Sequence, residues 1–248
     1  MKEKAMVTGK HVREDVLKVW DVPLRLFHWF LVAAIAIAFL SSEGDSPIAA
    51  WHIAAGWTAA VLIVFRLVWG FVGGKHARFV NFVRPSLVAG HIRSLLSRDP
   101  EHSVGHNPLG ALAVLALLAG VAAVLWTGIQ LDAGRGSEDL HEALAYGLLA
   151  LIGIHVVAVI AMSMVTRENL VRAMITGRKR TALHAGTRDA RAPGPMALLA
   201  GGAVIAATVV AILRFDAAAF GPRLETERGE RHGGDHQSSE SAGGTDKD

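Results

Sequence analysis

Histidines inside long apolar runs are the residues of this sequence best suited to carry chemistry. His141 and His155 lie in an otherwise hydrophobic run at residues 140–165, which is long enough to cross a bilayer as a helix. At about 1.5 Å and 100° per residue, their spacing places the two imidazoles about 21 Å apart along the axis and within about 40° of one face. A single histidine there would more often form a packing hydrogen bond, but ionisable groups at membrane depth are functional candidates by default.

Two further histidines match these two in depth. His28 lies near the start of the first apolar run and His52 near the start of the second, which runs in the opposite direction. His28 is therefore expected at the depth of His155, and His52 at the depth of His141. Two imidazoles on facing helices are the axial ligands that a non-covalent heme b needs, and helical bundles accept such cofactors in their cores. The spacing predicts two bis-histidine hemes, stacked across one membrane bundle for electron transfer.

The elements that must position these histidines are five apolar runs. Because 52% of the residues are hydrophobic and the runs reach membrane length, we expect an all-α integral membrane protein. The predicted organisation is a four-helix transmembrane di-heme bundle plus a fifth C-terminal transmembrane helix. The predicted spans are residues 22–40, 48–72, 108–131, 140–165 and 195–213. The predicted regions are a cytoplasmic N-terminus (1–21), a cytochrome b domain (22–180), a cytoplasmic linker (181–194), the fifth helix (195–213) and a disordered acidic periplasmic tail (214–248).

Charge predicts the orientation. Lysine and arginine gather before the first run, between the second and third, and after the fourth, whereas the loops at 41–47 and 132–139 are mainly acidic. By the positive-inside rule the N-terminus is cytoplasmic and, after five spans, the C-terminus periplasmic. The net charge of +3 and the basic pI follow from this topology, so we expect no nucleic-acid partner. We expect no signal peptide, because the first 18 residues are polar and no small-residue cleavage site follows.

The residue types narrow the cofactor chemistry further. Cysteine is absent, which excludes thiolate metal sites, iron–sulfur clusters and covalent heme attachment. Gly56 lies one turn after His52, where a missing side chain would let a flat macrocycle approach the helix. Arg66 lies fourteen residues after His52, at the depth of the inner pair, and is a candidate partner for a heme propionate. Snorkelling of Arg66 to the headgroups is the competing interpretation.

Weaker features are expected outside the bundle. Residues 87–96 carry apolar side chains at helical spacing, which predicts a short helix on the inner membrane surface or one packed on the bundle ends. Most histidines outside the four above are expected to be solvated; those in the cytoplasmic loops are His11, His76, His91, His102, His106 and His184.

Several blocks, in order, resemble one known family. They are Val19–Trp29 (VWDVPLRLFHW), Trp51–Gly56 (WHIAAG), Phe65–Gly73 (FRLVWGFVG), Gly105–Ala111 (GHNPLGA), Leu140–Glu142 (LHE) and Arg167–Lys179 (RENLVRAMITGRK). Together they resemble the bacterial cytochrome b561 and nickel–iron hydrogenase b-type cytochrome family. The resemblance covers about residues 16–180 and implies a four-helix cytochrome with two hemes held by His28, His52, His141 and His155. The fifth helix and the tail lie outside it, and the first block is closer to the b561-like branch.

The sequence therefore predicts a di-heme b-type cytochrome of the bacterial inner membrane, an electron-transfer subunit of a respiratory oxidoreductase rather than a stand-alone catalyst. It would pass electrons between the quinone pool and a periplasmic partner, either a c-type cytochrome or a hydrogenase. Quinone and membrane lipid are further expected ligands. One alternative is a superoxide:quinone oxidoreductase of the b561 type. Another is a transporter or assembly factor whose histidines relay protons or bind metal ions. A purely structural anchor gives no reason for four depth-matched histidines.

Overall fold

The computed structural model describes residues 16–43, 46–82, 108–180 and 189–223. Among these residues, five helices are long and apolar enough to cross a membrane: α1 (Val22–Leu40), α2 (His52–Val72), α5 (Pro108–Asp132), α6 (Glu138–Val165) and α8 (Pro195–Phe215). The shorter elements are β1 (Val16–Lys18), a 3₁₀ turn η1 (Ala49–Trp51), α3 (Phe79–Phe82), α7 (Leu170–Thr176) and β2 (Arg178–Arg180). The predicted membrane bundle with a fifth helix is confirmed.

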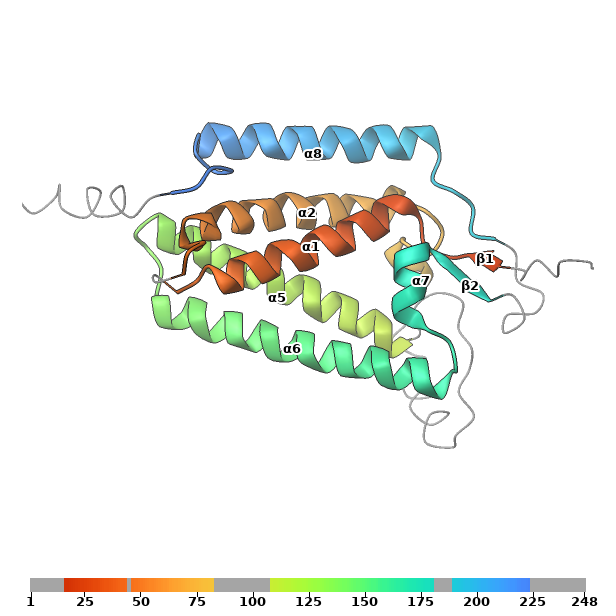
Figure 1. Ribbon diagram of the computed structural model, residues 1–248. Helices are drawn as coiled ribbons and strands as arrows, with labels where there is room; N and C mark the ends of the chain where they lie inside the picture. The colour runs from red at the N-terminus through yellow and green to blue at the C-terminus, as the bar shows by residue number, and fades with distance from the viewer. Residues whose placement is uncertain (1–15, 44–45, 83–107, 181–188, 224–248) are drawn as a thin grey trace, which may run out of the picture.

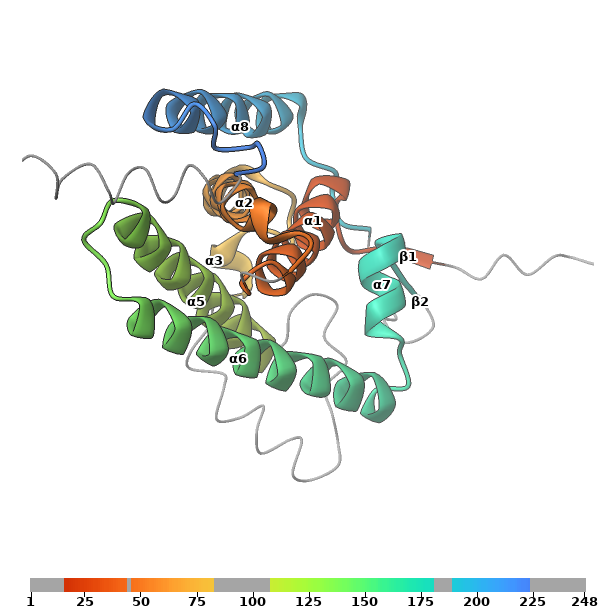
Figure 2. The same ribbon diagram turned by 60° about the vertical axis from the view of Figure 1, so that its left-hand side comes forward.

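The helices form a four-helix bundle with α8 added on one side (Figures 1 and 2). Helix α1 packs on α2, α5 packs on α6, and α2 joins the two pairs through α5. The shared core comprises Leu24 and Phe27 of α1, Ile63, Phe65 and Trp69 of α2, Leu118 and Val121 of α5, and Leu148 of α6. Most of α6 stays exposed, including Ile154 and Val157, as suits a helix whose outer face meets lipid.

The two ends of the bundle differ in how they are closed. The ribbon end carries α7 and the two-stranded ribbon of β1 and β2, paired antiparallel with Leu17 opposite Lys179. The far end carries η1, the turn between α5 and α6, and the end of α8 (Figure 1). Helices α1 and α5 run toward the far end, and α2 and α6 run back. Each histidine's depth then follows from its position along its helix.

Asp21 fixes the start of α1 at the ribbon end. Its carboxylate accepts the backbone N–H of Leu24 at 2.8 Å, an N-cap that satisfies one of the orphan donors of the first turn. The same carboxylate accepts the indole N–H of Trp69 at 3.2 Å and the backbone N–H of Gly74 at 3.1 Å. One side chain therefore joins the beginning of α1 to the end of α2, and so sets the height of His28 against α2.

The ribbon end is closed by a turn after α7. Gly177 ends α7 with φ 76°, a left-handed conformation that favours glycine, and its carbonyl accepts the backbone N–H of Val19 at 2.9 Å. Arg25 in the first turn of α1 donates to the carbonyls of Met174, at 3.3 Å, and Ile175. These contacts attach the segment that follows α6 to the segment that precedes α1.

Helix α8 lies along α2 outside the four-helix bundle (Figures 1 and 2). Gly201 makes the close approach possible, because a Cβ there would lie 3.0 Å from Cζ3 of Trp69 and 3.2 Å from Cε2 of Phe65. Beyond the helix, a turn returns to α2, with Ala219 fully buried against Val61 and Ile212.

The predicted spans differ from the helices mainly at the ends. The second was predicted from residue 48, but the segment before His52 is the 3₁₀ turn η1. The fourth begins at Glu138, because Ser137 caps it by accepting the backbone N–H of Leu140 at 3.3 Å. The fifth continues to Phe215, and residues 216–223 form a packed turn where the sequence suggested the start of a disordered tail. The surface helix predicted at 87–96 lies outside the described residues.

Candidate functional site

His52 and His141 come together at the far end of the bundle. Their ring centroids lie 6.3 Å apart with the ring planes at 77°, although the residues belong to α2 and α6. The His52 Nδ1–H donates to the carbonyl of Ala38 on α1 at 2.8 Å. Such a bond fixes the ring orientation and leaves Nε2 with its lone pair. We call these residues the far-end pair.

Thr127 sets the tautomer of His141 in the same way. The single hydroxyl proton of Thr127 is donated to backbone carbonyls one turn earlier, Val124 at 3.0 Å and Ala123 at 3.2 Å. The Thr127 oxygen also lies 2.9 Å from Nδ1 of His141. When the hydroxyl proton is donated to a carbonyl, this oxygen accepts the Nδ1–H of His141, which is the tautomer that leaves Nε2 free. Both rings of the far-end pair therefore have an Nδ1 contact that is compatible with Nε2 serving as a ligand atom.

His28 and His155 form the second pair, nearer the ribbon end. His28 lies in the second turn of α1 and His155 in the second half of α6, both half-buried. The indole of Trp29 stands edge-on to His28 at 5.2 Å between ring centroids. We call His28 and His155 the ribbon-end pair.

This donor set suits a heme better than a bare metal ion. A metal held by protein alone takes three or four side-chain ligands, and the described residues contain no group of three or more histidine, aspartate or glutamate side chains placed to hold one. A heme brings four nitrogens of its own and asks the protein for two axial ligands and an apolar surround. The far-end pair supplies two such imidazoles from apolar helices, and His28 and His155 are the candidates for a second set.

Gly56, which the sequence predicts to lie beside a heme, has open space next to its Cα. A Cβ at Gly56 would meet nothing within 4 Å, and the same holds for Gly147 and Gly153 of α6. These positions leave room beside the helices for a flat ligand. Gly128 of α5, which the sequence did not single out, has a different role: a Cβ there would lie 3.2 Å from Cε1 of His141, so glycine lets that ring pack on α5.

Arg66 is almost wholly buried near the ribbon end of α2, with 2% of its surface exposed. Its guanidinium carbon lies 4.6 Å from the centroid of the Phe79 ring, and it interacts electrostatically with Asp21. Its Nη1 has no hydrogen-bond partner. A buried guanidinium with an unused donor is poorly compensated by the protein alone and fits an additional anionic acceptor. The snorkelling alternative fits this burial less well.

Other sequence-predicted histidines divide into two groups. His76 follows α2 and is half-buried edge-on against Trp20, at 6.3 Å between ring centroids, so its side chain is only partly solvated. Burial, and then the positive charges of Lys75 and Lys179, lower its pKa below the ordinary value. The remaining loop histidines, His11, His91, His102, His106 and His184, lie outside the described residues.

The residues that support the far-end pair were missed by sequence reasoning. Ala38 acts through its backbone carbonyl, which no sequence pattern announces. Thr127 and Gly128 carried a faint signal, because a hydroxyl and a missing side chain stand together near the end of a run rich in alanine, leucine and valine. Their depth matches that of His141, since α5 and α6 form an antiparallel hairpin.

Comparison with known proteins gives a family-level match. A family model described as prokaryotic cytochrome b561 matches residues 19–177, which include all four histidines and stop before α8. No solved structure matches the chain.

The curated relatives carry hydrogenase-related names. A protein of Azotobacter vinelandii named "Probable Ni/Fe-hydrogenase B-type cytochrome subunit" is 27% identical over a match covering 71% of this chain and 95% of the relative. A protein of the same name from Rhodobacter capsulatus is 26% identical, with 71% and 89% covered. The "Probable Ni/Fe-hydrogenase 1 B-type cytochrome subunit" of Escherichia coli K12 is 24% identical, with 52% and 65% covered.

Proposed function

We infer the function of this chain from one premise, that it belongs to the prokaryotic cytochrome b561 family, and we propose that it is a di-heme electron carrier. It is a multi-pass membrane protein of a b-type cytochrome family. In the proposed function it moves electrons between the quinone pool and a redox partner at the opposite membrane face. The far-end pair would hold one heme b and the ribbon-end pair the other, both without covalent attachment.

The observation that carries this proposal is the far-end pair. Two histidines from helices far apart in sequence face each other at 6.3 Å between ring centroids, and each Nδ1–H already has an acceptor. Both Nε2 atoms are thereby left as ligand atoms in fixed orientations. A packing histidine needs only one such bond, and a proton relay does not need two rings that are both held through Nδ1.

The chain's own residues determine what a bound heme does. When bound, heme b carries one electron by cycling its iron between the ferric and ferrous states. Each histidine pair would hold one heme iron through two imidazoles, a ligand set that favours electron transfer over oxygen binding. The apolar side chains around the histidines exclude water, while Ala38 and Thr127 hold the rings and raise the basicity of the ligand nitrogens.

Arg66 and Gly56 are proposed to complete the two sites. Gly56 would allow the macrocycle of the far-end heme to approach α2, because its neighbourhood is open. Arg66 would donate a hydrogen bond from its unused Nη1 to a propionate of the ribbon-end heme. Arg66→Gln keeps a hydrogen-bond donor and removes the charge, so it should weaken ribbon-end heme retention and leave the far-end heme unchanged.

The orientation and the partner are part of the proposal. The ribbon end would face the cytoplasm, since basic residues gather in the segments at that end. The far end would then face the periplasm of a bacterial inner membrane and receive the redox partner. The relatives' names favour a hydrogenase as that partner, and a c-type cytochrome is the alternative.

Single histidine substitutions test the proposal. His141→Ala should halve the heme content of the purified protein and spare the ribbon-end heme, while His155→Ala should do the converse. His76→Ala serves as a matched control, because His76 lies outside the spans and should not change heme content. Loss of both hemes, or of neither, in His141→Ala would contradict the pairing. A colourless wild-type protein would favour a proton or metal path instead.

A further inference from the structure

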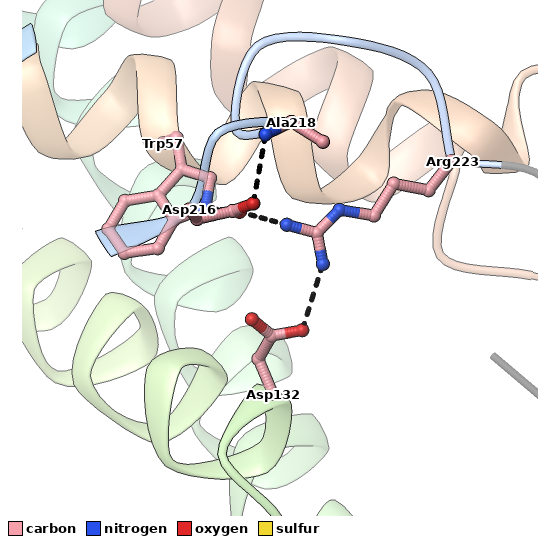
Figure 3. A network of polar contacts seen from close by, with 5 residues as sticks. All are labelled: Trp57, Asp132, Asp216, Ala218 and Arg223. Atoms are coloured by element: carbon pink, nitrogen blue, oxygen red, sulfur yellow. Dashed lines mark hydrogen bonds and ion pairs between the residues drawn. The ribbon is translucent and has the colours of Figure 1, made fainter. Parts of the chain in front are cut away.

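The turn after α8 carries a charged network at the far end (Figure 3). The Asp216 carboxylate accepts the indole N–H of Trp57 on α2 at 3.1 Å and the backbone N–H of Ala218 at 3.1 Å. The guanidinium of Arg223 pairs with Asp216 and, through Nη1 at 3.1 Å, with Asp132 at the end of α5. These side chains are largely shielded: 17% of Arg223, 12% of Asp216 and 28% of Asp132 are exposed.

Arg223 also holds the segment that leads into His52. Its backbone N–H donates to the carbonyl of Ala50 at 2.9 Å. Ala50 belongs to the 3₁₀ turn η1, which continues directly into α2 at His52. The turn that delivers Arg223 is itself packed, since Ala219 is fully buried between α2 and α8. A displacement of Arg223 would therefore move the backbone two residues before a proposed ligand.

The other branch of the network reaches the support of His141. Asp132 lies on α5, one helical turn after Gly128. Gly128 packs against the His141 ring, and its neighbour Thr127 contacts Nδ1 of His141. Arg223 thus joins two backbones, one carrying His52 and the other backing His141. A simple end cap for α8 would need neither contact, because Asp216 already accepts the N–H of Ala218 within its own turn.

We propose that Arg223 and Asp216 are positioning residues for the far-end pair, which makes the turn after α8 a clamp that sets the approach of His52 to His141. The clamp lies beyond the residues that the family model matches, so it is a property of this chain's fifth helix. The inference rests on the proposed function, because it concerns the geometry of a heme held by those two histidines. It gives α8 a role that membrane anchoring alone does not.

The charges indicate which substitution is informative. Arg223 is the cation between two carboxylates, so Arg223→Ala removes both ion pairs and leaves Asp216 and Asp132 to repel each other. Arg214→Ala is the matched control, because Arg214 lies in the last turn of α8 and is exposed, and its loss changes the net charge by the same amount. Both variants keep the four histidines and the helices that carry them.

The test uses the full-length protein purified with its hemes. The far-end heme is identified by the low-spin electron paramagnetic resonance signal that His141→Ala removes. In Arg223→Ala this signal should shift and the far-end heme should dissociate roughly tenfold faster, the lower limit usual for losing a residue that orients a ligand. The ribbon-end signal should not change, and Arg214→Ala should match the wild type in both measurements.

Other outcomes overturn the clamp. An unchanged far-end signal in Arg223→Ala, an equal effect on both hemes, or the same effect in Arg214→Ala would each refute it. Should Arg223→Ala not accumulate, Asp132→Asn removes one ion pair and keeps the bond to Ala50, and must shift only the far-end signal. A wild-type protein without heme would refute the proposed function, whereas two hemes insensitive to Arg223 and Asp132 would refute the clamp alone.

Discussion

Thr127→Val is the substitution whose effect on the far-end pair follows most directly from the structure. Valine has the shape of threonine without the hydroxyl, and residue 127 is 8% exposed, so neither packing nor solvent access should change much. The carbonyls of Ala123 and Val124 keep their helical N–H partners. The group that loses its partner is the Nδ1–H of His141, now held by Thr127 at 2.9 Å.

A buried donor left without a partner costs about 1–3 kcal/mol. Since about 1.4 kcal/mol corresponds to a factor of ten, far-end heme affinity should fall roughly 5- to 150-fold. The loss should be larger for ferric heme, because the bond to Thr127 raises the basicity of the ligand nitrogen. For each factor of ten by which the ferric heme loses more affinity than the ferrous heme, the midpoint potential of the far-end heme should rise by about 59 mV.

Heme transfer to an excess of an apoprotein scavenger measures the loss rate, and a potentiometric titration measures the midpoint. Thr208→Val in α8 is the control, because the Thr208 hydroxyl donates to Val204 one turn earlier at 2.7 Å in the same way but lies on a helix that carries none of the four histidines. Equal heme loss in both variants, or none in Thr127→Val, would refute the tautomer argument for His141.

Two further predictions concern the ribbon end. Asp21→Ala removes the α1 cap, worth about 1 kcal/mol, and leaves the buried indole N–H of Trp69, which is 1% exposed, without its acceptor. The melting temperature of the protein in detergent should therefore fall. A fall no larger than that caused by Asp189→Ala, a substitution of an exposed aspartate, would contradict the role of Asp21. Burial, and then the charges of Lys75 and Lys179, lower the pKa of His76 in the folded protein. As the pH falls through about 6.5, His76 is therefore protonated in the unfolded chain before it is protonated in the folded one, and the melting temperature should drop below that pH. The drop should be smaller in His76→Gln, and a pH profile of His76→Gln identical to that of the wild type would exclude His76 as its source.

The helices and the approach of His52 to His141 could be predicted from sequence because both depend on local quantities. Membrane length and apolarity determine each span, and depth follows from counting residues along it, which is how His52 was matched to His141, 89 positions later in the chain. The short η1 turn before His52 and the cap at Ser137 shifted only the boundaries. Charge patterns and histidine spacing needed no knowledge of side-chain packing.

The supporting contacts could not be read in this way. The acceptor for His52 is the backbone of Ala38, and the partner of His141 is one threonine in a long apolar run, so their roles depend on how the helices pack. Arg223 was assigned to a polar tail by composition, yet it pairs with Asp132, 91 residues away, once α8 lies along α2. The β1–β2 ribbon likewise joins two three-residue segments, Val-Leu-Lys and Arg-Lys-Arg, that are too short to show strand periodicity.

The number of hemes in the wild-type protein and in His141→Ala tests the central claim most directly. A pyridine hemochrome assay against protein concentration should give two b-type hemes per wild-type chain and one per His141→Ala chain, with the remaining heme low-spin. A single heme in the wild type, or an unchanged ratio in His141→Ala, would contradict the assignment of His52 and His141 as one axial pair.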